Sequence, residues 1–409
     1  MNKTEVKQNI TKINKLLRSD SYEAGIELIK TLDDPEITIG TLKAVIARIK
    51  KFLKQRDYEA IDTGIELARG LDEPAVFETL LEGCSIDKEG KIIRNKIFTG
   101  TGSAQPYLEY ALVNLIGYAP KNTKVEKSLK HTNIKTLSLK NYHLQNVDVL
   151  ANLTNLTSLD LNCSSIQNVD GLANFPNLTS LDLSKCYQLE NLNGLANSPN
   201  LTSLNMSDYY GYSPKNLDGL TNLTKLTDLN LSSFYSLENL DGLANLTNLT
   251  NLNLSDCESL PLGLNKLHNL KSLNLNFTNF TQNDLNKLNQ ISNLTNLNLS
   301  DCISLKNVDG LADLTNLTSL DLSNSYLENI DGLANLTNLI SLNFRNCQPL
   351  QNVDVLANLT NLANLDLSYC YKIEPKPSVD DWNLRNSIFE MTTREEVDAY
   401  QEEIRKSMK

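Results

Sequence analysis

Leucine alternates with polar residues in a short frame that recurs along most of the chain. Leu178, Leu181 and Leu183 are separated by Thr, Ser and Asp, and the same spacing returns at Leu249 and Leu317. This alternation places apolar side chains on one face of a short strand and polar ones on the other. The frame begins about eleven times, 21 to 25 residues apart, at Ile134, Leu156, Leu178, Leu201, Leu226, Leu249, Leu270, Leu294, Leu317, Leu339 and Leu362.

A repeat of this length with an LxxLxL frame is typical of leucine-rich repeats. One repeat cannot bury its leucines alone, whereas stacked repeats bury them in a continuous core. We therefore predict an α/β fold, a leucine-rich-repeat solenoid over residues 131–371 with a parallel sheet on its concave face. Counting the first apolar residue as position 1, the three apolar residues of the frame occupy positions 1, 4 and 6.

Position 9 of the repeat is the second regular feature. It holds five of the seven cysteines, and this recurrence favours a structural role over disulfide pairing. A small, weakly polar side chain at this bend can satisfy backbone groups. These cysteines are Cys186, Cys257, Cys302, Cys347 and Cys370.

The segment Asn239-Leu-Asp-Gly-Leu-Ala-Asn-Leu-Thr-Asn-Leu-Thr-Asn-Leu-Asn-Leu254 resembles the short repeats of internalin-type bacterial proteins. The resemblance extends over roughly residues 131–371 and implies a curved solenoid whose concave sheet binds partner proteins. The first residues contain no apolar h-region, and no LPxTG-like anchor follows the repeats. We therefore expect neither an export signal nor a cell-wall anchor, and a cytoplasmic location.

Residues 1–125 follow another pattern and are predicted to form an α-helical domain that caps the solenoid. The segments beginning at Tyr22 and Tyr58 align with each other, and Gly25 and Gly64 are 39 residues apart. This period is near that of HEAT-like helix pairs. A hairpin is expected over residues 85–93, and a last helix over residues 107–116.

Residues 372–409 are predicted to cap the other end of the repeats. Thr393-Arg-Glu-Glu396 is a capping-box pattern that opens a helix reaching about Met408. We expect Trp382 and Phe389 to cover the last coil, because the apolar end of a repeat array must be closed. Within the array, Leu285, Leu288 and Ile291 have helical spacing and predict one or two turns on the convex side.

Charge and hydropathy narrow the choice of partner. Nearly all of the net charge of −11 lies between residues 126 and 370, which favours a neutral-to-basic protein as partner. Nucleic acid is disfavoured because no basic stripe is visible. No run of about 18 apolar residues occurs, so no membrane partner is expected.

We find no residue pattern in the sequence that is typical of a catalytic or metal site. Three histidines and no CxxC, HxxxH or HExxH spacing are present. We predict no enzymatic activity, no metal and no cofactor. Cys163 stands one residue before the cysteine position, where a shifted structural cysteine is favoured over a reactive thiol.

Interface energy usually concentrates in a few Tyr, Trp and Arg residues. Tyrosine recurs at position 10 of three successive repeats, next to a tyrosine-containing insertion and two aspartates. We predict that this stripe binds the partner, with rings that merely pack over the edge as the alternative. The predicted function is a non-catalytic scaffold or regulatory subunit that binds a partner protein on the concave face of the solenoid, and the alternative is an internalin-like surface or secreted adhesin or effector. The predicted site residues are Tyr187, Tyr210, Tyr212, Tyr235, Asp208 and Asp256.

Overall fold

The computed structural model describes residues 1–71, 73–86, 92–99, 105–117, 135–140, 144, 147–150, 153–207, 214, 216–235, 241–257, 264–378, 383 and 388–409. The chain divides into two compact units. The first contains residues 1–166 and 170–178, and the second contains residues 167–169 and 179–409.

The N-terminal part of the first unit is helical, as predicted. Short polar caps start its helices: the Asp34 side chain accepts hydrogen bonds from the backbone N–H groups of Glu36 and Ile37, and Pro35 occupies the first helical position. The expected hairpin and last helix are also present. The elements are α1 (Lys3–Arg18), α2 (Tyr22–Leu32), α3 (Pro35–Leu53), α4 (Tyr58–Leu71), α5 (Pro74–Leu80), the antiparallel strands β1 (Ser85–Ile86) and β2 (Ile92–Ile93), and α6 (Gln105–Gly117).

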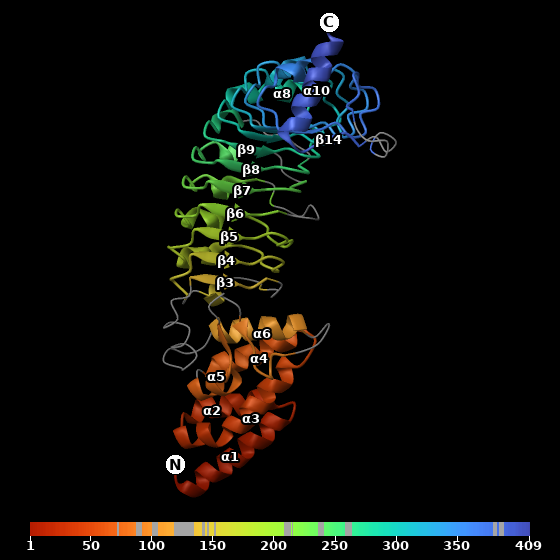
Figure 1. Ribbon diagram of the computed structural model, residues 1–409. Coiled ribbons are helices and arrows are strands. Elements are labelled where there is room, and N and C mark those ends of the chain that lie inside the picture. The colour runs from red at the N-terminus through yellow and green to blue at the C-terminus, as the bar shows by residue number, and fades with distance from the viewer. Residues whose placement is uncertain are drawn as a thin grey trace. The chain divides into compact units, whose positions relative to one another are not determined.

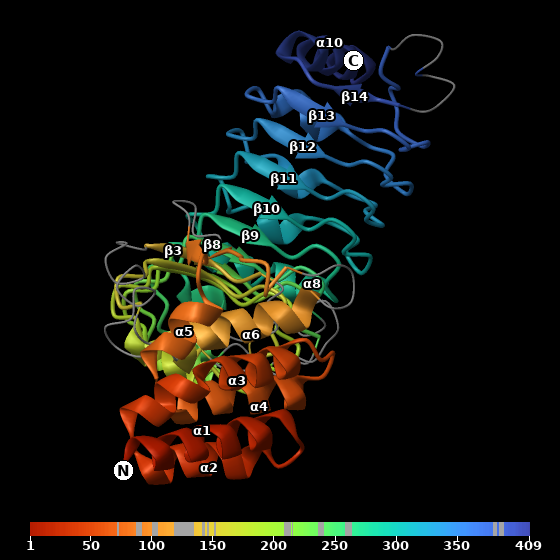
Figure 2. The same cartoon turned by 90° about the horizontal axis from the view of Figure 1, so that it is seen from below.

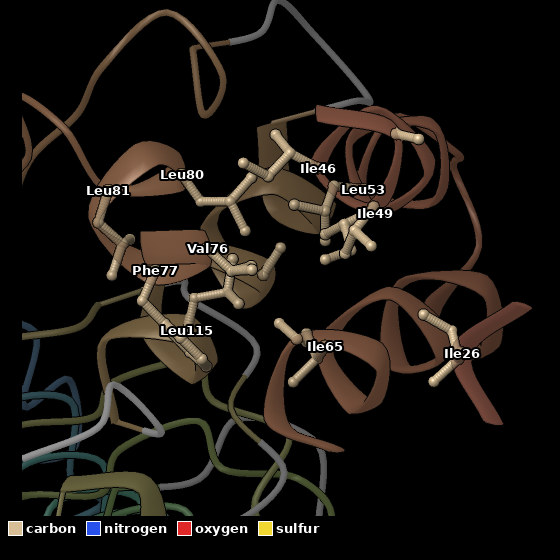
Figure 3. Packing of buried hydrophobic residues seen from close by; sticks show 14 of the residues in the cluster. Ile26, Ile46, Ile49, Leu53, Ile65, Val76, Phe77, Leu80, Leu81 and Leu115 are labelled. Carbon is tan, nitrogen blue, oxygen red and sulfur yellow. The ribbon is translucent and has the colours of Figure 1, made fainter. Parts of the chain in front are cut away.

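The two segments that align in the sequence occupy equivalent places in successive helix pairs. Gly25 of α2 lies against Leu17 at the end of α1, and Gly64 of α4 lies against Leu53 at the end of α3. A larger side chain at either glycine would meet the preceding helix, which explains why glycine recurs there. Isoleucine, leucine and phenylalanine side chains from these helices form one buried core (Figure 3).

The repeats form a leucine-rich-repeat solenoid with one three-residue strand per coil, in a sheet of twelve strands (Figure 1). Strand β3 pairs with β4, and each strand from β5 to β12 pairs with the next, in parallel. The strands are β3 (Thr136–Ser138), β4 (Ser158–Asp160), β5 (Ser180–Asp182), β6 (Ser203–Asn205), β7 (Asp228–Asn230), β8 (Asn251–Asn253), β9 (Ser272–Asn274), β10 (Asn296–Asn298), β11 (Ser319–Asp321), β12 (Ser341–Asn343) and β13 (Asn364–Asp366).

The strand register confirms the predicted leucine spine. Leu297 of β10 pairs with Leu273 of β9 and with Leu320 of β11, so position 4 of each coil meets position 4 of the next. These side chains are at most 3 % exposed. Burial of this kind stabilises a fold by about 25 cal/mol per Å² of apolar surface, and each coil obtains it only from its neighbours.

The return segments are short 3-10 helices, which lie away from the strands in the second unit (Figure 2). The repeat that begins at Leu270 has two helical turns, as expected. The short α-helix α8 (Gln282–Leu285) precedes the 3-10 helix η8 (Leu288–Gln290). The other segments are η2 (Asp148–Leu150), η3 (Asp170–Asn174), η4 (Asn193–Asn197), η5 (Asp218–Leu220), η6 (Asp241–Leu243), η7 (Leu264–Lys266), η9 (Asp309–Leu311), η10 (Asp331–Leu333) and η11 (Asp354–Asn358).

Polar ladders join the coils and account for the many Asn and Thr residues. The Asn248 side chain donates to the Thr224 carbonyl of the preceding coil at 2.7 Å, and Asn269 donates to Thr247 in the same way. On the strand side, the Thr250 hydroxyl donates to the Thr227 carbonyl at 3.0 Å. The asparagine amides supply donors to the Thr224 and Thr247 carbonyls, while the Thr227 carbonyl also accepts from the N–H groups of Thr250 and Asn251.

The cysteines at position 9 form a buried column, which confirms their predicted structural role. The thiol of Cys302 donates to the Leu275 carbonyl of the preceding coil at 3.3 Å, and Cys347 donates to Leu322 at 3.2 Å. Desolvation raises the pKa of Cys302 to about 11. At neutral pH these thiols therefore remain protonated donors.

The C-terminal segment closes the last coil with a strand and a helix. Strand β14 (Glu390–Met391) pairs antiparallel with β13, and α10 (Arg394–Ser407) begins with the predicted capping box of Thr393 and Glu396. The side chain of Gln401 donates to the carbonyls of Leu356 and Leu359. Of the two expected apolar plugs, Phe389 is buried, and Trp382 lies outside the described residues.

Within the described residues, no helix combines the length and the apolar character needed to cross a bilayer.

Candidate functional site

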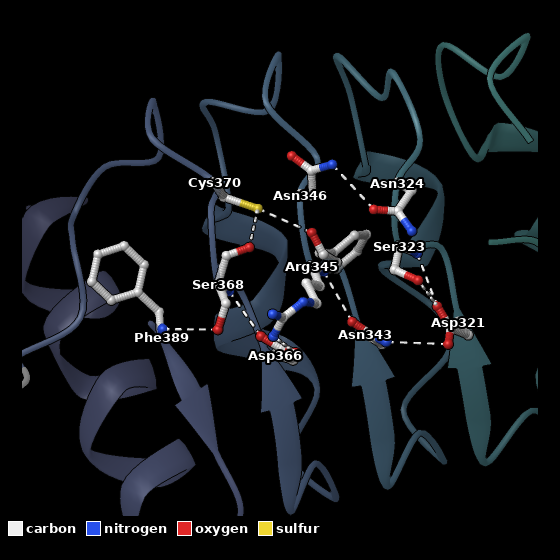
Figure 4. Close-up of polar contacts among 11 residues, drawn as sticks. Asp321, Ser323, Asn324, Asn343, Arg345, Asn346, Asp366, Ser368, Cys370 and Phe389 are labelled. Carbon is white, nitrogen blue, oxygen red and sulfur yellow. Dashed lines mark hydrogen bonds and ion pairs between the residues drawn. The ribbon is translucent and has the colours of Figure 1, made fainter. Parts of the chain in front are cut away.

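Polar side chains on the exposed face of the sheet form hydrogen bonds within their own coil and, in some repeats, to the neighbouring coil. In every repeat from Asp160 to Asp366, the Asn or Asp at position 5 accepts a hydrogen bond from the backbone N–H of position 7. Figure 4 shows this turn at Asp321 and Asn343. The second oxygen of Asp321 accepts from the Asn343 amide at 3.1 Å. The Asn and Asp side chains at position 5 therefore stabilise the turns of the solenoid, and fewer of their polar atoms are left to bind a partner.

Position 8 has a left-handed backbone in each repeat where its conformation is described. Its φ angles lie between 54° and 63°, and its occupants are chemically diverse. In seven of these repeats a described hydrogen bond joins the N–H of this residue to the position 7 carbonyl of the next coil, for example from Asp301 to Ser323 at 2.8 Å. The backbone is thereby held while the side chain is free to vary. The residues are Cys163, Lys185, Ser233, Asp256, Phe277, Asp301, Asn324, Asn346 and Tyr369.

Large apolar side chains gather at positions 8 and 10, beside the carboxyl ends of the strands. Phe277 at position 8 is 60 % exposed, and Ile303 and Tyr326 at position 10 are 61 % and 52 % exposed. Tyr371, also at position 10, is 51 % exposed and makes an edge contact with Tyr369. We call these five residues, Phe277, Ile303, Tyr326, Tyr369 and Tyr371, the rim.

A pocket of about 360 Å³ opens within the rim, between the coils of Ile303 and Tyr326. These two side chains form apolar walls, and carboxylate and amide groups supply the polar part. A partly apolar hollow with a few converging polar groups is the usual character of a binding site. The lining residues are Asp301, Ile303, Asn324, Ser325, Tyr326, Asn346, Gln348 and Pro349.

The predicted tyrosine stripe is only partly within the described residues. Tyr235 is 40 % exposed, while Tyr187 and Asp256 are half-buried. The other three predicted site residues, Asp208, Tyr210 and Tyr212, lie outside the described part of the chain. The rim continues the same position 10 column, so extending that column to later repeats would have found Ile303, Tyr326 and Tyr371 in the sequence.

The expectation that Cys163 is a shifted structural cysteine is wrong. Ser164 occupies the buried slot at position 9, and Cys163 takes the left-handed position 8, where it is half-buried. The repeat keeps its ordinary length here, because serine is small enough to fill the slot. No base or acid is placed beside Cys163 by any described hydrogen bond or ion pair.

A basic surface that the sequence analysis overlooked lies on α1. Four lysines, Lys3, Lys7, Lys12 and Lys15, project from its exposed side, opposite the buried Val6, Ile13 and Leu17. Helical periodicity collects them on one face although they are scattered in the sequence. The first unit therefore carries a local positive surface within a chain of negative net charge.

No family model and no curated protein matches the chain. Solved structures of repeat proteins do resemble it. An internalin, InlF, from Listeria monocytogenes is 22 % identical with a TM-score of 0.46, covering 78 % of this chain and 90 % of the other. The functional domain of InlJ from the same organism is 24 % identical with a TM-score of 0.45, covering 66 % and 61 %. The Drosophila Toll–Spatzle complex gives 21 % and 0.44, covering 56 % and 38 %. At these identities the likeness concerns the fold alone.

Proposed function

We propose that this chain is a non-catalytic interaction protein that binds a partner protein along the rim. The observation that carries the proposal is the contrast between the two parts of the surface. Polar groups on the sheet are already bonded within a coil or between coils, as at Asp321, which accepts from Ser323 and from Asn343. Large apolar groups a few residues away, such as Ile303, remain exposed.

Exposed aromatic and aliphatic groups in one patch are typical of protein interfaces. The backbone at the rim is also held in place, because the N–H groups of Phe277, Asp301 and Asn324 each donate to a carbonyl of the next coil. A rigid surface loses little conformational entropy when a partner binds. These two properties favour a protein ligand over a small molecule that would be chemically changed.

The position of the thiols also favours binding over catalysis. Burial raises the pKa of Cys257 and of Cys302 to about 11, so neither is a ready nucleophile at neutral pH. The free state of all seven cysteines is compatible with a reducing compartment, and we propose the cytoplasm as the location.

We further propose that the tyrosine stripe extends the binding surface of the rim toward the N-terminal repeats, and that the partner protein is neutral to basic. Its proposed residues remain Tyr187, Asp208, Tyr210, Tyr212, Tyr235 and Asp256. Substitution of one central tyrosine in this stripe by alanine should weaken binding by about 2 kcal/mol if it is a hot spot.

The test uses the full-length chain as bait in extracts of its native host, with quantitative mass spectrometry of the captured proteins. A double variant, Ile303→Ser with Tyr326→Ala, should lose its specific partner. The matched control is Ile39→Ser, since Ile39 is 73 % exposed on α3, outside the repeats. Equal capture by the double variant and the wild type, with both folded by circular dichroism, would contradict a rim-based function.

A further inference from the structure

The rim pocket has a carboxylate at its polar end. The Asp301 Oδ2 atom accepts hydrogen bonds from the side-chain amides of Asn276 and Asn324, each at 3.2 Å. Its other oxygen, Oδ1, accepts no hydrogen bond in the described contacts. One acceptor oxygen of this carboxylate therefore remains for a ligand.

A chain of amides is oriented toward this carboxylate. The Gln348 Nε2 atom donates to Asn346 Oδ1 at 3.0 Å. The Asn346 Nδ2 atom donates in turn to Asn324 Oδ1 at 3.1 Å (Figure 4). Asn324 then donates to Asp301. Each amide presents its N–H to the next group, so the chain polarises toward Asp301 and holds the carboxylate in place.

The cations on the neighbouring coils are engaged with other carboxylates. Among the described ion pairs, Lys306 pairs with Glu328 at 3.3 Å and Arg345 pairs with Asp366 at 3.7 Å. None of the described ion pairs includes Asp301. The pocket therefore combines an acidic group that lacks a cationic partner within these pairs with apolar walls at Ile303 and Tyr326.

We infer that the pocket receives a Lys or Arg side chain from the partner protein. This inference rests on the proposed function and specifies the chemistry that the rim recognises. Such a side chain has an apolar stem that packs on Ile303 and a cationic head that reaches Asp301. The Tyr326 ring already has the Lys306 ammonium group 5.8 Å from its centroid, so Tyr326 contributes an apolar wall for the stem. A volume of about 360 Å³ is at the small end of binding pockets and suits one or two side chains.

The structure offers a conservative variant and a matched control for the test. Asp301→Asn removes the charge and keeps an acceptor oxygen, and asparagine is already tolerated at the same left-handed position in Asn324 and Asn346. Asp313→Asn makes the same change at an exposed residue of the return segment, outside the pocket lining, where the next coil has Asn335. Both variants should fold as the wild type does.

The experiment selects binders from a displayed random heptapeptide library on the full-length wild-type chain. Selected peptides should contain Lys or Arg, and replacing that residue with norleucine or citrulline should weaken binding to the wild type about tenfold. Binding to the Asp301→Asn variant should change little on the same replacement, while the Asp313→Asn variant should respond like the wild type.

The outcomes separate this inference from the proposed function. Peptides that depend on Ile303 and Tyr326 but bind Asp301→Asn unchanged would leave the rim as the binding surface and overturn the cationic ligand. Selected peptides without basic residues would also overturn it. Peptides indifferent to the rim variant and to Asp301→Asn, or a library with no rim-dependent binder, would contradict both proposals.

Discussion

The thiol of Cys257 donates a hydrogen bond to the carbonyl oxygen of Leu231 in the preceding coil, 3.3 Å away. The same relationship joins Cys370 to Phe344 at 3.0 Å. In both cases the acceptor is the carbonyl of position 6, where the strand turns away. The Phe344 carbonyl also accepts from the Cys347 N–H at 3.0 Å, so there the thiol adds a second hydrogen bond, from the next coil. The thiol is small enough to enter the core and polar enough to meet this group.

Thiol labelling should divide the cysteines into two classes. Cys84 and Cys163 are half-buried, and the five cysteines at position 9 are buried. We expect a disulfide reagent at pH 8 to modify at most these two in the native chain, and all seven after unfolding in guanidinium chloride. Mass spectrometry of labelled peptides gives the assignment. Rapid native labelling of Cys347 would contradict the described core.

The free energy of unfolding should fall at alkaline pH because the buried cysteines at position 9 then lose their protons. Burial raises the pKa of Cys257 and Cys302 from an ordinary value near 9.0 to about 11. Since the folded chain holds the proton more tightly than the unfolded chain, this contribution is complete below pH 9 and is lost as the pH rises toward 11. By linkage it amounts to roughly 3 kcal/mol per thiol.

The control is a Cys257→Ala, Cys302→Ala double variant, measured by thermal unfolding between pH 7 and 11. It should be less stable than the wild type at pH 7, and the difference should shrink as the pH approaches 11. Titration of lysines and tyrosines acts on both proteins alike and cancels in this comparison. A difference that stays constant with pH would show that the thiols do not titrate in this way.

Gly242→Ala should destabilise the repeats strongly. A Cβ atom at this position would overlap the backbone carbonyl of Leu217 in the preceding coil. The coils would have to separate locally, which we expect to cost about 3 kcal/mol. Gly70→Ala is the control, because there the nearest atoms belong to the flexible end of Lys30 and alanine favours a helix. Equal melting temperatures for the Gly242 variant and the wild type would contradict the close stacking.

Gln401→Leu should loosen the C-terminal cap. Gln401 is 1 % exposed, and its amide serves the carbonyls of both Leu356 and Leu359. Leucine fills similar space but leaves both carbonyls without this donor, at a cost of about 2 kcal/mol. Hydrogen exchange should rise in η11 and α10 first. Asp398→Ala, which removes only an exposed pair with Arg394, should change stability by less than about 0.5 kcal/mol.

The fold was largely predictable because its signals are local and repeated. Leu320 and the leucines above and below it carry a period that specifies one strand per coil, and Thr393 and Glu396 mark the start of the last helix. Position 9 was also readable, because cysteine recurs there. Cys163 was misassigned because a one-residue offset in sequence changes a buried slot into a turn with positive φ.

The rim pocket could not be predicted in the same way. In the sequence, Asp321 and Asp301 are both polar residues of the repeat, yet the first accepts from a turn N–H while the second lines a pocket. Whether an aspartate bonds to the turn or lines a pocket depends on which backbone groups lie beside it once the coils are stacked. The residues at position 10 could have been found in the sequence. Only the hydrogen bonds of the structure show that acidic residues such as Asp321 are already bonded, whereas the side chains at position 10 are exposed.

The left-handed position has a consequence for how this protein can diversify. Because its N–H, as at Asn346, bonds to the following coil whatever side chain is attached, the residue can change from lysine to aspartate to phenylalanine without altering the register. Each coil thus offers one interchangeable side chain on an unchanging frame. New binding preferences can arise by single substitutions along that column, and an engineer could rewrite the partner one coil at a time.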